Sequence, residues 1–230
     1  MISVIIPTFN ESDTISRTIE KVRLAAKNSE LEIIVVDGGS TDQTVSIVKN
    51  ADALIISSPR GRAIQMNRGA AEARAKILYF LHADSTPPSN FANYISDSVL
   101  SGAVSGCFRL GFDYRHWFLR VNCWFTQFDI NAVRFGDQSL FVLKDVFIQA
   151  GGFRETLLLM EDQEIIPRIK KYGKFTVMNA TILTSARKYL SNGVFRMQAI
   201  FFLIWVSYYL GFSQKILVKL YRSLIKAHKL

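Results

Sequence analysis

Hydrophobic residues in the first hundred positions gather into short, continuous runs that alternate with longer polar segments. Four such runs are "ISVII" (2–6), "LEIIVVD" (31–37), "ALIIS" (53–57) and "ILYFL" (77–81). They are rich in β-branched residues and lack regular polar alternation, which is typical of strands buried on both faces. The segments between them have helical spacing, as in Ile15, Ile19 and Val22 behind a predicted N-cap at Ser12. This alternation predicts an α/β fold, a three-layer sandwich with a mostly parallel central sheet.

The alternation fades after residue 100, although single elements can still be predicted. The pattern favours strands at 103–112 and 139–143 and an aromatic-rich helix at 117–128. A further helix is predicted over 161–173, with Pro167 either kinking it or lying near its start.

The charge balance changes sharply along the chain. Residues 1–164 carry 16 Lys and Arg against 19 Asp and Glu, whereas residues 165–230 carry 12 Lys and Arg and no acid. The positive excess therefore belongs entirely to the tail. Such asymmetry indicates an anionic partner: a membrane surface, a phosphate-bearing substrate or nucleic acid.

Two segments of this tail suggest a membrane. Residues 197–214 are 18 uncharged positions, close to the about 20 that span a bilayer, although polar residues and a glycine interrupt them. The next segment places apolar residues on one helical face and cations on the other, namely Lys215, Lys219, Arg222, Lys226 and Lys229. This pattern fits a helix that lies in a membrane interface, apolar side down. The alternative is a helix that packs on the domain or on a second subunit.

Cysteine, histidine and N-terminal patterns bear on location. Cys107 and Cys123 form no CxxC, and the three histidines are far apart, so we expect free thiols and no zinc site. The N-terminal "MISVIIPTFN" has no basic start, and its apolar run is too short for a signal peptide. We therefore expect a cytoplasmic protein, peripheral on the inner face of the cell membrane.

Polar side chains follow each of the four predicted strands. Three strand ends supply an acid, and the remaining one supplies cations: Glu11, Asp37, Asp84, and Arg60 with Arg62. Ligands of open parallel sheets bind beyond the carboxyl ends of the strands. There Asp37 could accept hydrogen bonds from a base or ribose, Arg62 could pair with phosphate, and Asp84 could hold Mg²⁺ or Mn²⁺. Taken singly, each acid could equally be a turn or helix cap.

The stretch "MEDQE" (160–164) sets three carboxylates among apolar flanks. Buried carboxylates cost free energy unless they are paired, metal-bound or used in chemistry. The alternative is a helix start whose acids favour the N-terminal dipole. The chain contains no GxGxxG, no P-loop and no GxSxG, so a nucleotide site would be built from side chains.

These motifs together carry a family resemblance. The stretches "SVIIPTFNE", "VVDGGSTD", "HADS" and "MEDQEIIPRIKKYG" resemble glycosyltransferase family 2 in order and approximate spacing, over about residues 2 to 190. "LHADS", "GDQSLF" and "GGF" look most like a bacterial subgroup, transferase 2, rSAM/selenodomain-associated. The resemblance implies an inverting transferase of the GT-A fold that uses nucleoside-diphosphate sugars.

The resemblance also implies residue roles. Nucleotide contacts fall to Pro7, Thr8, Phe9, Glu11, Asp37, Arg62, Ala83 and Arg187. Asp84 matches the last acid of the family's DxD and would hold Mg²⁺ or Mn²⁺, with His82 in place of the first acid as an alternative ligand. Gly38 replaces the second acid of the common "DDGS", so a contact to the base is lost there.

The implied mechanism is a direct displacement at the anomeric carbon. Asp162 would act as general base on the acceptor hydroxyl, with Glu161 as its tuning neighbour. Apolar surroundings and Glu161 are expected to raise the pKa of Asp162. Arg62, Arg187 and the metal would neutralise the leaving diphosphate. Glu164 is expected to be ordinary helix surface.

We expect a catalytic domain at 1–190, with a nucleotide half (1–100) and an acceptor half (101–190), followed by a basic helical tail at 191–230. The expected partners are a UDP- or GDP-sugar, a lipid or membrane-borne acceptor, an anionic membrane surface contacted by 194–230 and, as an open alternative, a second copy of the chain.

Three other functions compete with this interpretation. A non-catalytic, membrane-associated sugar-nucleotide-binding protein would keep the fold without turnover. A nucleic-acid-binding protein would fit the pI near 9.6, but the strand-end acids would repel phosphate. A sugar-nucleotide-forming enzyme would need a glycine-rich N-terminal loop, where this chain has "PTFNE".

Overall fold

A single mixed sheet organises the molecule. The computed structural model describes residues 1–134 and 136–226, and within them one eight-stranded sheet has the order β3-β2-β1-β4-β7-β6-β8-β5. The strands are β1 (Ile2–Thr8), β2 (Leu31–Asp37), β3 (Leu54–Ser57), β4 (Ile77–Phe80), β5 (Ser85–Thr86), β6 (Ala103–Phe112), β7 (Leu140–Leu143) and β8 (Lys174–Thr184). The four neighbouring strands β3, β2, β1 and β4 run parallel to one another, and β6 runs parallel to β8. Strand β7 is antiparallel to its neighbours β4 and β6, and β5 is antiparallel to β8. The predicted α/β, mostly parallel fold is confirmed.

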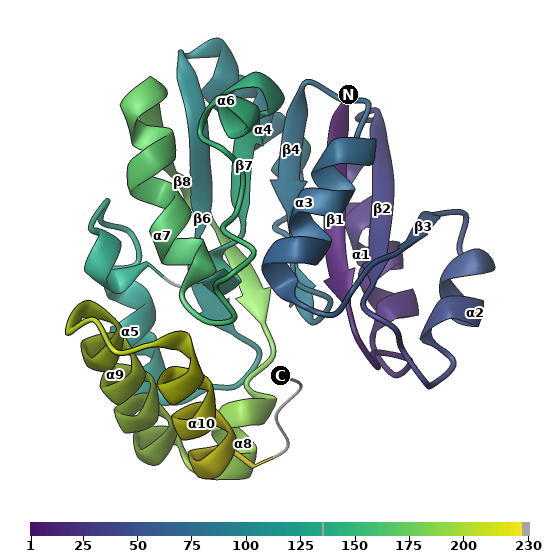
Figure 1. The fold of residues 1–230 in the computed structure, drawn as a ribbon. Coiled ribbons are helices and arrows are strands. Elements are labelled where there is room, and N and C mark those ends of the chain that lie inside the picture. Colours follow the sequence, from purple (N-terminus) through teal and green to yellow (C-terminus); the bar gives the residue numbers. More distant parts are fainter. Residues whose placement is uncertain (135, 227–230) are drawn as a thin grey trace.

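Helices cover both faces of this sheet (Figure 1). They are α1 (Ile15–Ala26), α2 (Thr44–Lys49), α3 (Arg62–Glu72), α4 (Phe91–Leu100), α5 (Trp117–Phe125), α6 (Lys144–Gln149), α7 (Glu161–Ile169), α8 (Arg187–Asn192), α9 (Val194–Tyr209) and α10 (Gln214–Leu224). Helices α1 and α4 pack on one face, and α3, α6 and α7 on the other. Helices α5, α8, α9 and α10 gather beyond the end of the β6–β8 half of the sheet.

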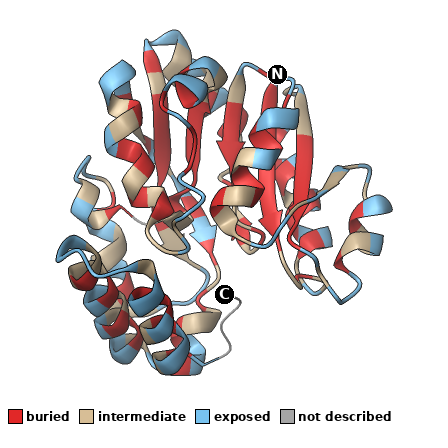
Figure 2. Cartoon of the chain, viewed as in Figure 1, coloured by how far each residue is buried: buried red, intermediate tan, exposed pale blue. Residues whose placement is uncertain are grey.

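The continuous apolar runs follow from burial on both faces. Along β1, Val4 and Ile6 belong to the cluster under α1 and α4, whereas Ile5 belongs to the cluster under α3 and α7. All three are fully buried, and Figure 2 shows that the central strands of the sheet consist mostly of buried residues. A strand with helices on both sides has no face for polar residues, so alternation is lost.

Most predicted elements are confirmed, with local differences. Helix α1 begins after Thr14 rather than Ser12. Pro167 lies inside α7, which ends only two residues later at Ile169 and continues as a single 3-10 turn at Lys170–Tyr172, as expected when a proline removes a helix donor. Strand β8 was not predicted, because its apolar positions are mixed with exposed polar ones along "KFTVMNATILT".

The two tail helices pack onto the domain. Leu217, Tyr221 and Ile225 of the last helical segment are buried in a cluster with Leu119 and Tyr189. The expected placement of this apolar face in a membrane interface is therefore wrong, and the alternative, packing on the domain, is found. Helix α9 has 16 residues, and no helix in the described part of the chain is long and apolar enough to cross a bilayer. The predicted basic residue Lys229 lies outside the described residues.

Candidate active site

A cavity of about 970 Å³ lies where the carboxyl ends of β1 and β4 meet α3, α7 and α8. The predicted site residues that line it are Pro7, Thr8, Phe9, Glu11, Arg62, His82, Ala83, Asp84, Glu161, Asp162 and Arg187. They come from five separate segments of the chain, and the sheet topology brings them together. Helices α5, α9 and α10 complete the opposite wall.

Arg62 joins the two acids of the "ED" pair. Its Nη2 lies 2.7 Å from Oδ2 of Asp162, and its Nε lies 3.2 Å from Oε1 of Glu161. Glu161 is 2% exposed, and its Oε1 has no hydrogen bond among the described residues, so that contact is an ion pair only. Met160, with φ at 71°, turns the chain into α7 and directs both acids to the cavity. Arg62, at the first position of α3, thereby links the two halves of the sheet.

The raised pKa in this pair belongs to Glu161. Burial raises the pKa of its carboxyl to about 7, and the charge of Asp162 adds to the effect, while Arg62 opposes it. Glu161 is the acid that the first turn of α7 buries, whereas the side chain of Asp162 is 21% exposed.

His82 is held by two partners. Its Nδ1 lies 2.7 Å from Oδ1 of Asp137, and its Nε2 contacts Nη2 of Arg62. A guanidinium can only donate, so Nε2 must accept and Nδ1 must carry the proton given to Asp137. Burial alone would raise the pKa of Asp137, but the hydrogen bond from His82 and the charges of Lys188 and Arg62 hold it well below its usual range. Both nitrogens are therefore engaged, which makes His82 a positioning group for Arg62.

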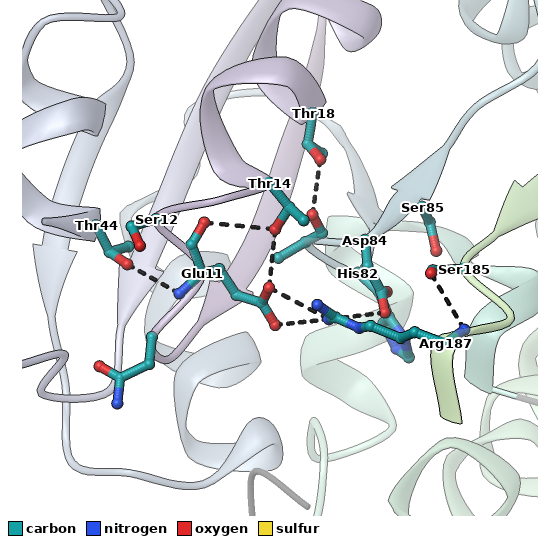
Figure 3. A network of polar contacts seen from close by, with 12 residues as sticks. Glu11, Ser12, Thr14, Thr18, Thr44, His82, Asp84, Ser85, Ser185 and Arg187 are labelled. Carbon is teal, nitrogen blue, oxygen red and sulfur yellow. Dashed lines mark hydrogen bonds and ion pairs between the residues drawn. The ribbon is translucent and has the colours of Figure 1, made fainter. Parts of the chain in front are cut away.

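Arg187 makes the second bridge of the site (Figure 3). Its Nη2 lies 3.0 Å from Oε1 of Glu11 and 3.1 Å from Oδ2 of Asp84, and so it joins the ends of β1 and β4. Thr14 donates a further hydrogen bond of 2.8 Å to Oε2 of Glu11. Burial tends to lower the pKa of Arg187, but Glu11 and Asp84 raise it, so the guanidinium stays charged. Three elements that are distant in sequence are thus fixed at one edge.

The donor set around Asp84 fits a metal only in part. No group of three or more His, Cys, Asp or Glu residues that could hold an ion occurs among residues 1–134 and 136–226. Asp84 offers one carboxylate at the cavity, and its side chain is 18% exposed. Mg²⁺ and Mn²⁺ are commonly held by one or two carboxylates together with substrate phosphates and water. The residues therefore fit an ion that arrives with a diphosphate, rather than one caged by the protein alone.

Asp37 is the predicted site residue that does not line the cavity. Its Oδ2 accepts hydrogen bonds of 3.0 Å from the backbone N–H groups of Gly39 and Ser40, so it holds the turn after β2. Its contact with a nucleotide stays a prediction. Beside it, a Cβ at Gly38 would lie 3.1 Å from the side chain of Gln65. That crowding gives a physical reason for glycine at a position where the family resemblance implies an acid.

Sequence reasoning missed three polar residues of the site. Gln65 donates to the carbonyl oxygens of Thr8 and Val36, at 2.8 and 2.7 Å, and ties β1 to β2. Asp137 orients His82, as described above. Lys188 lines the cavity, and within the described residues its ammonium has no hydrogen-bonding or ion-pairing partner. Burial would lower the pKa of Lys188, but Tyr221, Asp137 and Asp84 raise it. For Asp137 a signal existed, since "GDQSLF" places an isolated acid directly before a buried strand.

The structure also explains the residues at two further motif positions, Gly136 and Glu164. At Gly136, a Cβ would collide with the carboxylate of Asp162, so the glycine lets the backbone approach the proposed base. Glu164 was expected on the helix surface, and that expectation is wrong. Its side chain is 10% exposed and forms ion pairs of 3.0 Å with Arg154 and 2.5 Å with Arg168. It anchors the segment before α7 to the body of that helix.

Comparisons with known proteins agree with this geometry. The model of the glycosyl transferase family 2 matches residues 3–146. An uncharacterized glycosyltransferase of Mycobacterium tuberculosis is 34% identical over 118 residues, which cover 49% of this chain and 45% of its own. The poly-beta-1,6-N-acetyl-D-glucosamine synthase of Staphylococcus aureus is 33% identical over 116 residues, covering 46% and 28%. The chain thus spans less than half the length of these curated relatives.

Solved structures show the same fold. The mannosyltransferase PcManGT from Pyrobaculum calidifontis, in complex with GDP-Man and Mn²⁺, has a TM-score of 0.66 at 18% identity, over 88% of this chain and 61% of that one. S. aureus TarS in complex with UDP has a TM-score of 0.61 at 16% identity, over 79% and 57%. The fold is therefore that of the GT-A glycosyltransferases. Because the family match extends over more than half of the sequence and includes the strand ends that carry Glu11 and Asp84, the chain belongs to glycosyl transferase family 2.

Proposed function

We propose that the protein is an inverting glycosyltransferase that moves a sugar from a nucleoside diphosphate to an acceptor hydroxyl. The observation that carries this proposal is the arrangement of two arginine–carboxylate bridges in one cavity, Arg62 with Asp162 and Arg187 with Glu11 and Asp84. One bridge offers a base and the other an anion site. A cavity of about 970 Å³ has room for a sugar nucleotide and part of an acceptor.

The nucleotide side of the proposed site is the edge formed by the ends of β1 and β4. Pro7, Thr8, Phe9, Glu11 and Ala83 line it. The guanidinium of Arg60 lies 3.7 Å from the centre of the Phe9 ring, which gives a planar surface for a base to stack against. UDP or GDP is the proposed carrier, since TarS has been crystallised with UDP and UDP-GlcNAc and PcManGT with GDP-Man.

A divalent ion, Mg²⁺ or Mn²⁺, would be held by Asp84 together with the donor's phosphates. When bound, such an ion neutralises negative charge on the diphosphate. Support comes from PcManGT and from the glucosyl-3-phosphoglycerate synthase of Mycobacterium tuberculosis, which were both crystallised with Mn²⁺. The chain's own contribution is Arg187, whose guanidinium can turn from Asp84 towards phosphate.

In the proposed reaction Asp162 takes the proton of the acceptor hydroxyl. The acceptor oxygen then bonds to the anomeric carbon as the bond to the diphosphate breaks, with inversion and release of a nucleoside diphosphate. Arg62 neutralises Asp162 in the absence of substrate. A bound diphosphate would compete for this guanidinium, so the carboxylate becomes an effective base only after the donor has bound. His82, itself held by Asp137, orients Arg62 in both positions.

Several finer assignments belong to the same proposal. The motifs "LHADS", "GDQSLF" and "GGF" favour the bacterial transferase 2, rSAM/selenodomain-associated subgroup. A lipid or membrane-borne acceptor at the inner face of the cell membrane fits the acid-free tail. The division into a catalytic domain at 1–190 and a tail at 191–230, and a homodimer, also remain proposals.

The decisive experiment combines binding and turnover. A thermal-shift panel of nucleoside diphosphates and sugar nucleotides, with Mg²⁺ or Mn²⁺, identifies the donor because a ligand of the native state raises apparent stability. Single-turnover release of the matching diphosphate then tests transfer. Stabilisation by no nucleotide in the panel would remove the proposal.

One observation favours a second candidate, a non-catalytic sugar-nucleotide-binding protein. The only carboxylates of α7 that line the cavity within the described residues, Glu161 and Asp162, are both paired with Arg62. If donor binding does not release Asp162, the protein binds without turnover. Nucleotide binding without diphosphate release in any acceptor extract would support this candidate.

A further inference from the structure

The cavity has an apolar half that the proposed chemistry does not use. Opposite Asp162 its wall consists of side chains from α5, α9, α10 and the loop before α7, including Phe125, Leu158, Phe201, Phe202, Trp205 and Val218. A sugar and a diphosphate are polar and gain little from such a wall. This half therefore points to an apolar part of the second substrate.

The same helices carry an exposed aromatic surface. We define the α5–α9 patch by its large exposed apolar residues: Trp117, Val121, Trp124, Phe125 and Phe128, and Phe195, Phe202, Tyr209 and Leu210. The two helices lie side by side, since the rings of Phe118 and Phe195 are 4.9 Å apart and Asn122 donates to Gln198 at 3.4 Å. The patch is therefore one continuous surface. Large exposed apolar patches are rare on soluble proteins and mark sites of protein or membrane contact.

The patch and the cavity are continuous with each other. Phe125, 43% exposed, and Phe202, 62% exposed, belong to the patch and also line the cavity. Trp205, which also lines the cavity, stacks on Phe202 with ring centres 6.1 Å apart. An apolar chain can thus pass from the surface to the cavity without crossing a charged rim at this point.

Charges around the patch select its partner. Arg120 on α5 and Arg196 on α9 are exposed, and so is Arg115, two residues before α5. Of the nearby acids, Asp129 is paired with Arg134 at 2.6 Å and with Lys170 at 2.7 Å, and Asp113 accepts the backbone N–H of Ala186. An aromatic surface flanked by exposed cations is complementary to an anionic lipid surface.

We infer that the α5–α9 patch docks on an anionic bilayer and that the acceptor is an amphiphile drawn from it, its hydrocarbon chain lying between α5 and α9 and its hydroxyl reaching Asp162. This inference rests on the proposed function for the hydroxyl alone. It also replaces the expected membrane contact through the apolar face of α10 by one through α5 and α9. The occupant follows from the continuity of patch and cavity and from the charges beside them.

The tryptophans allow a direct test. The chain has three, and Trp117 and Trp124 lie on the patch while Trp205 lines the cavity. The full chain is titrated with vesicles of phosphatidylcholine and phosphatidylglycerol whose acyl chains carry bromine, a quencher that acts at contact. We expect strong quenching in the wild type. A variant with Trp117→Phe and Trp124→Phe, in which only Trp205 emits, is expected to be quenched as well.

Matched variants distinguish docking through this patch from non-specific adsorption through any exposed apolar residue. Phe195→Ser with Leu210→Ser removes two exposed residues of the patch, 56% and 71% exposed, whereas Leu24→Ser with Leu100→Ser removes two residues, 69% and 86% exposed, from α1 and α4. We expect the first pair to lose most of the quenching and the second to keep it. Vesicles of phosphatidylcholine alone should bind several-fold more weakly.

Several outcomes would overturn the inference. If brominated vesicles do not quench the wild type, the patch does not dock on a membrane. An equal loss of quenching in the two serine variants would also contradict docking through this patch. If the wild type is quenched but the variant that retains only Trp205 is not, the patch docks on the bilayer and no acyl chain enters the cavity. That result would contradict the proposal of an amphiphilic acceptor. A concentration-dependent dimer that the Phe195/Leu210 variant abolishes makes the patch a subunit interface instead. Nucleotide thermal shifts measured on the same samples report the proposed function separately.

Discussion

Nη2 of Arg62 lies 2.7 Å from Oδ2 of Asp162, and this ion pair joins α3 to α7 at the wall of the cavity. The first residue of α3 therefore holds the first turn of α7, 100 positions further along the chain. The pair has a structural role in the free protein and, in the proposed reaction, must break for catalysis. Its substitution should consequently alter both stability and donor binding.

Replacing Arg62 by alanine should leave Glu161 and Asp162 without their cation. We expect the free energy of unfolding to fall by about 1–3 kcal/mol, less than for a fully buried pair because Arg62 is partly exposed. Urea unfolding at pH 8 measures the change. A triple variant with Glu161→Gln and Asp162→Asn should recover part of the loss, since it has no uncompensated acids. Additive losses would show that the ion pair is not the cause.

Replacing Asp162 by asparagine should keep the shape of the site and remove the proposed base. We expect turnover to fall by about 100-fold or more, while the thermal shift with nucleoside diphosphate remains. Asp145→Asn, at an exposed position on α6, is the control and should be close to wild type in both. Unchanged turnover in Asp162→Asn would assign the base elsewhere.

The raised pKa of Glu161 predicts a pH dependence of stability. Its folded pKa, raised to about 7 from 4.5, means that the folded state binds the proton more tightly than the unfolded state. The free energy of unfolding should therefore decrease as pH rises from about 4.5 to about 7, by on the order of 1–3 kcal/mol from this group. Glu161→Gln should flatten the curve in this window and be the more stable protein at pH 8.

Asp137 also makes the free energy of unfolding depend on pH, but at lower pH values than Glu161, so it does not interfere with the test. Its pKa is held below the usual range, so its stabilisation is complete above the unfolded value of about 4 and is lost at lower pH. Chemical denaturation of wild type and Glu161→Gln at pH 5, 6, 7 and 8 isolates Glu161 as the difference between the two curves, since the histidines titrate in both proteins. The same slope in wild type and Glu161→Gln would contradict the assignment of the raised pKa.

Replacing Gly136 by alanine should displace Asp162, because the new Cβ would meet its carboxylate. We expect a loss of stability of about 1–3 kcal/mol and a larger loss of turnover than of nucleotide affinity. Combining it with Asp162→Ala should recover stability, since the shorter side chain leaves room. A double variant no more stable than Gly136→Ala alone would point to strain in the backbone instead.

Metal binding should depend on nucleotide, because Asp84 supplies a single carboxylate and Arg187 competes for it. Calorimetric titration with Mn²⁺ should show little heat for the free protein and clear binding once UDP or GDP is present. Asp84→Asn should lose that second signal but retain weak nucleotide binding. Tight Mn²⁺ binding without nucleotide would contradict the proposed ligand set.

The sequence predicted well where a single physical signal dominated. Strands β1, β2 and β4 are almost entirely buried and have no polar face, so their apolar runs identified them. The run of β3 identified it as well, although this strand lies at the edge of the sheet and is partly exposed, which the sequence did not predict. Strand ends then placed Glu11, Asp84 and Arg62 at one edge, and the cavity brings them together. Motif resemblance, rather than periodicity, connected them with Asp162.

The remainder depended on tertiary packing that a local pattern does not contain. Strand β8 mixes exposed polar residues with buried ones, because one of its faces is only partly covered. The apolar stripe of α10 could serve a bilayer or a protein core equally well, and only the positions of Leu119 and Tyr189 decide between them. Likewise, which acid of the "ED" pair is buried depends on the turn at Met160.

The position of α9 and α10 along the chain has a consequence for biosynthesis. Ribosomes make the strands that carry Glu11 and Asp84 well before the residues that close the cavity, such as Trp205 and Tyr221. A nascent chain can therefore form its nucleotide edge while the opposite wall is still missing and water has free access. In the proposed enzyme, transfer to an acceptor must therefore wait until the last helices have packed and completed the wall that excludes water.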